Sequence, residues 1–448
     1  MNRHLIDQYS APVPRYTSYP TAPHFHGGID QETYAGWLNE VDPAQSVSLY
    51  LHVPFCDRLC WFCGCHTKQV QRYDPVAKYL EALHAEIKLV SSKIGRRRLS
   101  AVHLGGGSPT IMSPYDIQRL GEALRSAFEF APDCEISLEV DPNDIDESKF
   151  DFWTDFGVTR ASFGVQDFDP VVQQAINRPQ TFEQTRMAIE GFRKRGVSSI
   201  NLDVLYGLPH QTMETLRRTM EQVISLSPDR LALFGYAHVP WMKKHQRLID
   251  ETVLPDRHAR FDQASLGAEL LEQAGYIRIG IDHFARPDDA MAKVALEGNL
   301  RRNFQGYTTD GAGCLIGLGA SAIGRLPQGY VQNVVATGEY MTRALNGQLP
   351  VARGYALANA ERATGWVIES LMCAFEIRLS DLARLFPGEA ETVAERIRAL
   401  AEHDADGLVE FDGSSLVVTP RGRPFVRTLA ARLDPFMTRD EARYSAAV

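Results

Sequence analysis

The chain lacks any long apolar run: no stretch approaches the roughly 20 apolar residues that a membrane-spanning helix needs. Its first 22 residues contain no apolar core of the kind that a secretory signal requires. The sequence also has no internal repeat with a period of about 20–50 residues. We therefore expect a cytoplasmic protein with no membrane partner.

Cations are scarce relative to acids, with 47 Lys and Arg against 56 Asp and Glu, so the net charge is −9 over 448 residues. Non-specific binding of nucleic acid needs a basic footprint, and we expect no nucleic-acid partner. A local basic pocket for a small anion stays compatible with this balance. The hydrophobic fraction of 44% and the charged fraction of 23% are typical of a folded chain with two or three domains.

Cysteines are few and unevenly placed. There are seven, an odd number, and four fall within ten residues: Cys56, Cys60, Cys63 and Cys65. A disulfide framework spreads its cysteines along the chain and needs an oxidising compartment, so this clustering indicates a metal site instead. The C-x3-C-x2-C spacing places three thiolates on one loop, and thiolates are the usual ligands of iron–sulfur clusters.

Three cysteines on a four-iron cluster would leave one iron open to a substrate or cofactor. Two alternatives remain at this point. One is a structural zinc site completed by Cys65 or His66, although such sites usually draw cysteine pairs from two separate segments. The other is an electron-transfer cluster with Cys65 as its fourth ligand.

Short apolar segments alternate with amphipathic ones from about residue 46. The pattern predicts strands at 46–53, 99–106, 135–140, 160–165, 200–207 and 231–237, and helices at 76–93, 115–128, 181–195 and 213–226. This alternation indicates βαβ units and an α/β fold with a parallel sheet. Six strands fit a partial (β/α)6 barrel of the TIM type, because a full eight-stranded barrel typically needs roughly 250 residues.

The regions around these units divide the chain further. A helix over 258–274, an apolar run over 276–287 and a glycine-rich loop over 314–324 are expected to extend the barrel. Later segments predict helices at 358–376, 379–386, 389–403 and 421–432 and a hairpin at 407–420, a layout similar to a winged helix. We expect an irregular N-terminal extension over the active site (1–45), a barrel unit (46–350) and a mostly helical C-terminal domain (351–448).

Polar or glycine residues stand near the ends of successive predicted strands. Gly105, Gly106 and Gly107 end the second strand before Ser108, and glycines let a backbone approach a ligand closely. Glu139, Gln166, Arg178 and Asp203 lie near or beyond the ends of later strands, where an acid can bind ribose hydroxyls. Each could alone be a turn or a solvated acid, but the succession predicts a lined pocket at one mouth of the barrel.

The cysteine loop after the first strand and the GGGSP segment after the second resemble the radical S-adenosylmethionine (SAM) superfamily. By that resemblance, Cys56, Cys60 and Cys63 hold a [4Fe–4S] cluster, and its open iron binds the amino and carboxylate groups of SAM. An electron from the reduced cluster then cleaves SAM into a 5′-deoxyadenosyl radical. The cofactors supply this chemistry, and the protein supplies position and exclusion of water.

A narrower resemblance is to the oxygen-independent coproporphyrinogen III oxidase family. The segments of this chain that carry the resemblance are 14–22, 49–65, 103–110, 138–143, 163–169, 203–212, 234–240, 282–289, 301–309 and 317–324. The similarity weakens over the last 90 or so residues. Cys65 and the YTSYPTA segment (16–22) belong to the family signature. One departure is Ser108, where family members often have Thr, and both supply a hydroxyl.

The resemblance implies oxidative decarboxylation of coproporphyrinogen III to protoporphyrinogen IX in heme biosynthesis, in which two propionates become vinyl groups. It implies two SAM molecules in one site, a flavodoxin- or ferredoxin-like electron donor, an unknown electron acceptor and a monomer. Cys65 is expected to be an accessory residue and not a cluster ligand. The positions that match family residues around the two SAM molecules are Tyr50, Gly106, Gly107, Ser108, Glu139, Gln166, Arg178, Asp203, Ala237, Phe304 and Ile323.

A substrate with four carboxylates also needs cations, and guanidinium groups hold carboxylates bidentately. The candidates are Arg178, Arg286, Arg301 and Arg302, with at least two of them expected to be plain surface cations. The YTSYPTA segment, preceded by Arg15, is expected to fold over the cavity. Two alternative functions are a heme-binding carrier related to this family and a radical SAM enzyme with another substrate. Such carriers commonly lack the fourth cysteine and the N-terminal segment, and this chain has both.

Overall fold

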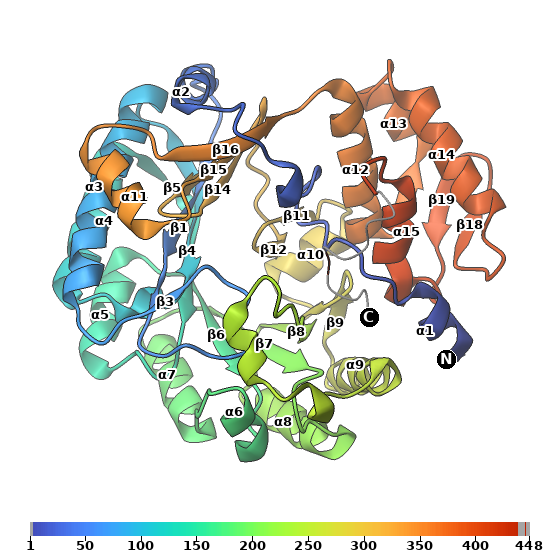
Figure 1. Ribbon diagram of the computed structural model, residues 1–448, viewed down its shortest axis with the longest axis horizontal. Helices are drawn as coiled ribbons and strands as arrows, with labels where there is room; N and C mark the ends of the chain where they lie inside the picture. The colour runs from blue at the N-terminus through green and yellow to red at the C-terminus, as the bar shows by residue number, and fades with distance from the viewer. Residues whose placement is uncertain (1–2, 438–443, 445–448) are drawn as a thin grey trace.

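Six parallel strands, each followed by a helix, form the main part of the computed structural model, which describes residues 3–437 and 444 (Figure 1). The strands, in their order in the sheet, are β1 (Val47–Val53), β4 (Arg98–Gly106), β5 (Glu129–Val140), β6 (Arg160–Gln166), β7 (Ser199–Tyr206) and β8 (Arg230–Gly235). The helices that follow them are α3 (Asp74–Ile94), α4 (Pro114–Ala127), α5 (Glu147–Phe156), α7 (Phe182–Lys194), α8 (Met213–Ser225) and α9 (Arg257–Gln273). The predicted partial barrel is confirmed.

Two short helices of the barrel were not predicted, α5 and α6 (Pro170–Ala175). Helix α5 is only ten residues long and therefore spans fewer than three turns, too few for a clear helical period. Its Phe150, Trp153 and Phe156 face the core.

Six further strands extend the sheet beyond the six βα units. Strand β13 (Leu315–Leu318) runs parallel to β1 on its free side and is followed outward by the antiparallel β14 (Ile323–Leu326), β15 (Gly329–Asn333) and β16 (Val351–Ala356). At the other edge, β10 (His283–Ala285) and β9 (Ile277–Ile279) split the apolar run that the sequence showed.

The expected glycine-rich loop over 314–324 was therefore wrong, because this stretch contains all of β13 and the start of β14. A Cβ atom on Gly317 would lie 2.7 Å from the backbone carbon of Ile323. The glycine allows two strands to approach each other closely, and does not mark a flexible connection.

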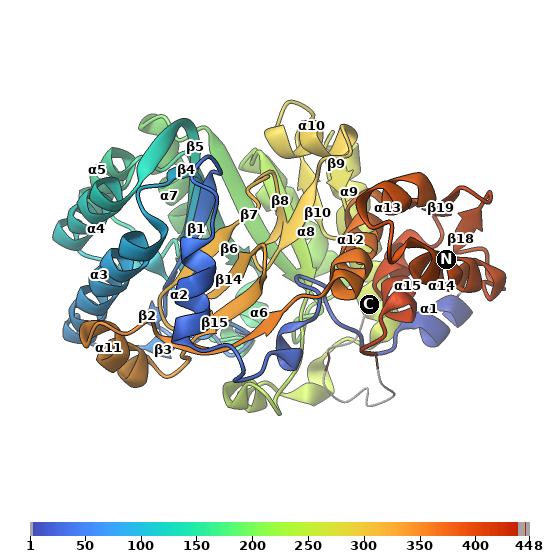
Figure 2. The same ribbon diagram turned by 90° about the horizontal axis from the view of Figure 1, so that it is seen from above.

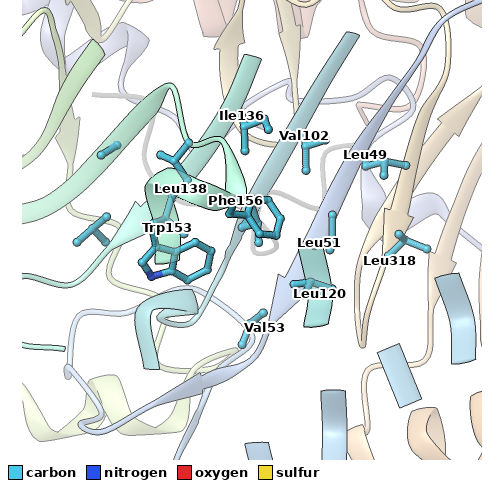
Figure 3. Packing of buried hydrophobic residues seen from close by; sticks show 14 of the residues in the cluster. Leu49, Leu51, Val53, Val102, Leu120, Ile136, Leu138, Trp153, Phe156 and Leu318 are labelled. Atoms are coloured by element: carbon cyan, nitrogen blue, oxygen red, sulfur yellow. The ribbon is translucent and has the colours of Figure 1, made fainter. Parts of the chain in front are cut away.

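The main hydrophobic core lies between the outer face of the sheet and its helices (Figure 3). Leu49, Leu51 and Val53 of β1 point toward this core, where Trp153 and Phe156 pack. Because side chains alternate along a strand, the residues between them face the inside of the barrel. Truncation of the fully buried Trp153 to Ala would cost about 3–5 kcal/mol of stability.

The C-terminal unit stands beside the barrel (Figures 1 and 2). It contains α12 (Asn359–Ala374), α13 (Leu379–Leu385), α14 (Ala390–Glu402) and α15 (Val426–Leu433), with a sheet of β17 (Glu376–Arg378), β19 (Ser415–Val418) and β18 (Val409–Phe411). The predicted hairpin is β18–β19. Since β16 pairs with β15, the barrel sheet runs to Ala356, six residues past the boundary expected from the sequence.

The N-terminal 45 residues are not irregular as expected, because α1 (Arg3–Tyr9) and α2 (Gln31–Asn39) lie within them. Helix α1 buries Leu5, Ile6 and Tyr9 in the same hydrophobic cluster as the C-terminal unit. Helix α2 packs on α3 at the far side of the barrel (Figure 1). The described residues include no helix long and apolar enough to cross a membrane.

Candidate active site

The inner face of the barrel is polar. Tyr50 and His52 project from β1, and their neighbours across the sheet are His103 on β4 and Glu139 on β5. Further along the sheet, Asp203 stands on β7 beside Asn201. The carboxyl ends of parallel strands meet at one edge, so these side chains and the loops that follow them form one mouth.

The cysteine loop is fixed to the end of the second barrel strand. Gly107 N donates to Val53 O and Ser108 N donates to Phe55 O, both over 2.8 Å. A Cβ atom on Gly107 would lie 2.6 Å from Phe55 O, so a larger residue would push the loop away. The GGGS segment thus supports the cysteine loop directly.

Each of the three spaced cysteines has a polar neighbour at its sulfur. Arg178 Nη1 donates to Cys60 Sγ over 3.4 Å, and the backbone N–H of Cys65 donates to Cys63 Sγ over 3.4 Å. Cys56 Sγ lies 3.5 Å from Thr67 Oγ1. Donors at sulfur stabilise the thiolate, which is the form that binds metal.

The sulfur environments differ. Burial raises the pKa of Cys56 to about 12, whereas hydrogen bonding with Cys65 lowers the pKa of Cys63 to about 7. Within the described ranges, no three His, Cys, Asp or Glu side chains converge closely enough to hold a single metal ion. Three thiols on one loop, two of them with N–H donors, suit the larger span of an iron–sulfur cluster.

Arg178 comes from the loop after α6, far from the cysteines in sequence. Its guanidinium joins Asp141 Oδ2 at 3.0 Å and Gly164 O at 2.7 Å while it donates to Cys60. Burial lowers the pKa of Arg178, but Asp141 and Cys60 raise it further, so the net shift is upward. Its Nε atom is buried and has no partner among the described residues, which leaves one donor for a ligand.

Glu139 is half-buried and has two fixed partners, unlike an ordinary solvated strand-end acid. Its carboxylate accepts Gly106 N–H at 2.9 Å and lies 3.1 Å from His103 Nε2. Burial raises the pKa of Glu139, but the contacts with His103 and Gly106 outweigh burial, and the pKa falls below its ordinary value. Glu139 is therefore an ionised acceptor next to the glycine segment.

The remaining predicted SAM residues are spread around the mouth. Burial raises the pKa of Asp203 to about 6, and Gln166 adopts a φ of 66° at the end of β6, which is uncommon without glycine. Ser108 is buried, and its hydroxyl lies 2.9 Å from that of Thr110. Ile323 begins β14, next to β13.

A cavity of about 380 Å³ lies beside this mouth, between the barrel and the C-terminal unit. Ala237 and Phe304, two of the predicted SAM residues, line it. Five arginines from different parts of the chain also line it: Arg15, Arg260, Arg278, Arg302 and Arg427. Three acids line the cavity: Asp282, Glu269 and Glu272. Five arginines against three acids leave an excess of two positive charges.

The arginines in this cavity act on one another. Burial, followed by the charges of Arg15 and Arg302, lowers the pKa of Arg427 to about 9. Arg302 stacks over Tyr307 at 4.4 Å, and its Nε and Nη1 atoms are buried with no partner among the described residues. Burial raises the pKa of Asp282, but His283 and the arginines lower it overall. Arg302 and Arg427 are buried, whereas Arg15 and Arg278 are exposed; the two buried cations are costly until an anion enters.

The four arginines that the sequence suggested as carboxylate ligands lie in different environments. Arg302 lines the cavity as expected, and Arg178 contacts Cys60 instead. Arg301 is largely exposed and lies 3.6 Å from Glu369, in a smaller neighbouring cavity. Arg286 is also exposed at the surface, so it and Arg301 fit the expectation that at least two of the four are plain surface cations.

Sequence reasoning missed several residues of the site. Arg260, Arg278 and Arg427 sit on α9, β9 and α15, and no local pattern links them. His52 and His103 could have been found, because each occupies an inward position of an alternating strand.

The fold and the site define the class of protein. The family model described as "Radical SAM superfamily" matches residues 50–223, and that described as "HemN C-terminal domain" matches residues 357–425. Members of this superfamily bind a [4Fe–4S] cluster and SAM, and so does this chain. It is an oxidoreductase of the radical SAM type.

The chain is similar to curated proteins over nearly its whole length. It is 48% identical over 437 residues to the oxygen-independent coproporphyrinogen III oxidase of Bradyrhizobium diazoefficiens, covering 97% of both chains. The protein of the same name from Escherichia coli is 38% identical over 440 residues, covering 98% of this chain and 96% of that one.

A solved structure of the Escherichia coli coproporphyrinogen III oxidase, titled a radical SAM enzyme, matches with a TM-score of 0.91 at 37% identity. It covers 97% of this chain and 99% of its own. The chain belongs to the oxygen-independent coproporphyrinogen III oxidase family.

Proposed function

We propose that this chain converts coproporphyrinogen III to protoporphyrinogen IX without oxygen, turning two propionates into vinyl groups for heme biosynthesis. The observation that carries the substrate assignment is the cavity with five arginines beside the strand ends. A substrate with four carboxylates supplies the anions that this cavity needs.

The cofactor site is assigned by the cysteine loop and its supports. Cys56, Cys60 and Cys63 are the three cluster ligands, and Arg178 stabilises Cys60 through its hydrogen bond. When bound, the cluster and SAM supply a 5′-deoxyadenosyl radical that removes a hydrogen atom from the propionate. Cys65 lies beside Cys63 as an accessory residue, and its backbone N–H donates to the Cys63 sulfur.

The SAM molecules are held by residues of the polar mouth. Gly106 and Gly107 offer close backbone approach, and ionised Glu139 orients Gly106 through its N–H. The other residues assigned to SAM are Tyr50, Ser108, Gln166, Arg178, Asp203, Ala237, Phe304 and Ile323. Since Ala237 and Phe304 line the arginine cavity, a SAM molecule held by these two residues would adjoin the substrate.

The arginines have a positioning role in this scheme. They hold the carboxylates that are not removed, so that a reacting propionate faces the mouth of the barrel. Each conversion removes one hydrogen atom, one carbon dioxide and one electron from the substrate, and an acceptor takes up the electron. The N-terminal segment takes part, because Arg15 and Thr17 line the cavity.

The test is an anaerobic assay with the reconstituted protein, coproporphyrinogen III, SAM and a reductant. We expect a product that has lost two carbon dioxide molecules, with one SAM consumed for each vinyl group formed. Tight heme binding with no vinyl product would establish the carrier alternative instead. Modification of a different substrate, seen by mass spectrometry, would replace this substrate assignment. We expect the protein to be cytoplasmic and monomeric. Size-exclusion chromatography tests whether it is a monomer.

A further inference from the structure

The loop after β8 covers the cysteine loop with a segment that the proposed reaction does not use. This segment, residues 241–248, has the sequence WMKKHQRL and contains no acid. Its second half forms a short 3-10 helix, Lys244–Leu248. It follows the barrel strand that ends at Gly235 and therefore stands at the same mouth as the cysteines.

Three side chains of the 241–248 segment hold the cysteine loop by its backbone. Lys243 Nζ donates to Cys65 O over 3.0 Å, and Gln246 Nε2 donates to Phe62 O over 2.9 Å. His245 Nε2 lies 2.8 Å from Cys63 O. Gln246 is fully buried and therefore anchors the segment, so the backbone that carries the outward side chains is held in place.

The outward face of the same segment combines apolar and cationic groups. Trp241, Met242 and Leu248 are 54%, 62% and 59% exposed. Lys244 and Arg247 are exposed beside them and form no ion pair within residues 3–437. Large apolar side chains next to Arg are the composition of protein interfaces, and isolated surface residues rarely gather this way.

Neighbouring acids do not neutralise these cations. The carboxylate of Asp250 accepts the backbone N–H and hydroxyl of Thr252, and Glu251 lies 2.9 Å from His238. The chain as a whole carries a net charge of −9, which would repel an acidic protein. A local cationic patch directly over the cysteine loop would orient such a partner despite that charge.

We propose that the 241–248 segment is the docking surface for an acidic one-electron carrier protein, which delivers the electron to the cluster held by the cysteine loop beneath it. This proposal rests on the proposed function only in that the cluster must be reduced. One electron leaves the reduced carrier, which is oxidised by one electron, and reduces the cluster; no bond is made or broken. Trp241, Met242 and Leu248 form the apolar centre of the interface, and Lys244 and Arg247 contact carboxylates of the carrier.

The experiment compares two double variants of the reconstituted holoprotein. Lys244→Glu with Arg247→Glu reverses two charges on the patch. Lys93→Glu with Arg96→Glu makes the same change at the far end of the barrel, because α3 runs away from the cysteine loop and both residues are exposed there. Stopped-flow absorbance then measures the rate of cluster reduction by reduced flavodoxin, used as the acidic carrier, and by dithionite.

We expect the patch variant to be reduced by flavodoxin roughly tenfold or more slowly than the wild type at low salt, with a weaker salt dependence. Titration with flavodoxin should show a matching loss of affinity. Reduction by dithionite should be unchanged in both variants, and the control should resemble the wild type with flavodoxin.

Trp241→Ser separates the apolar contact from the charge, and it should weaken flavodoxin binding with little change in salt dependence. Equal flavodoxin rates in the patch variant and the control would overturn the proposal. Equal slowing by both double variants would also overturn it, since total charge would then be the cause. Failure of the proposed substrate assignment would appear differently, as normal reduction and SAM cleavage without vinyl product.

Discussion

Arg178 Nη1 donates to Cys60 Sγ over 3.4 Å and bonds Asp141 Oδ2 over 3.0 Å, so one guanidinium links the cysteine loop to the end of β5. Arg178→Met would leave the largely buried Asp141 without its cation, with only the Asn143 donors remaining, and one sulfur without its donor. We expect a loss of about 3 kcal/mol in the free energy of unfolding, together with lower iron content after reconstitution. Denaturant titration and iron analysis measure the two effects.

The matched control for this change is Arg186→Met. Arg186 is 44% exposed and pairs with Glu183 and Glu190 on the surface of its helix. Such pairs contribute about 0–1 kcal/mol, so the control should retain both stability and iron. Full iron content in the Arg178 variant would contradict a role at the cluster.

The four clustered cysteines should respond differently to substitution. Cys56→Ser, Cys60→Ser or Cys63→Ser should abolish the iron–sulfur absorbance and SAM cleavage, because each removes one of three ligands. Cys65→Ser should keep the cluster, since the backbone N–H that donates to Cys63 Sγ survives and the serine hydroxyl can replace the Cys65 thiol as a side-chain donor to that sulfur. Loss of the cluster in the Cys65 variant would restore the four-cysteine interpretation.

The arginine cavity predicts a change in substrate affinity that spares the radical chemistry. Arg302→Leu removes a guanidinium with two buried, unpartnered N–H groups in the cavity. A charge-assisted hydrogen bond contributes about 1.5–3 kcal/mol, so KM for coproporphyrinogen III should rise roughly tenfold or more. SAM cleavage without substrate should stay at the wild-type rate.

Arg286→Leu is the control for the cavity, because Arg286 is exposed and lines no part of it. Its KM should match that of the wild type. An equal effect in both variants would mean that overall charge, and not the cavity, binds the substrate.

A buried acid behind the sheet predicts a pH dependence of stability. Glu86 on α3 accepts Gly319 N–H and Tyr340 O–H, each over 2.7 Å, and Asn333 Nδ2 over 2.6 Å. Burial raises its pKa from 4.5 to about 7. The folded state therefore binds more protons than the unfolded state between these values, and stability should fall as the pH rises through this range.

The Glu86→Gln variant has no titrating group at this position, so its pH dependence of stability is the reference for the wild type. Between pH 4.5 and 7, the free energy of unfolding of the wild type should fall by on the order of 2–3 kcal/mol relative to that of the variant. Denaturant titrations at several pH values measure this difference. Parallel pH profiles for the two proteins would show that Glu86 is not protonated in the folded state.

Much of the barrel could be predicted from the sequence because its signals are local. Alternating apolar strands and amphipathic helices are imposed by burial on one face of each element, so five of the six strands could be placed within two residues at each end. Strand β5 begins six residues before the expected start. Cys56, Cys60 and Cys63 gave the cofactor class through their spacing and their place directly after the first strand. The same reasoning failed at Gly317, where glycine permits close strand packing and does not mark a loop.

Other features depended on contacts between distant residues. Helix α1 is stabilised by burial of Leu5 and Tyr9 against the C-terminal unit, which no window of 20 residues contains. The arginine cavity joins Arg15 to Arg427 across nearly the whole chain.

The sequence by itself determined the cysteine loop, the order of the βα units and the polar residues that follow the strands, because these depend on neighbours in the chain. Only the tertiary structure decided which arginines face one another and which remain in solvent. Their spacing along the chain carries no information about that choice. The packing of the folded chain decides which arginines are buried: Arg302 lies inside with unpartnered N–H groups, whereas Arg286 stays exposed to water.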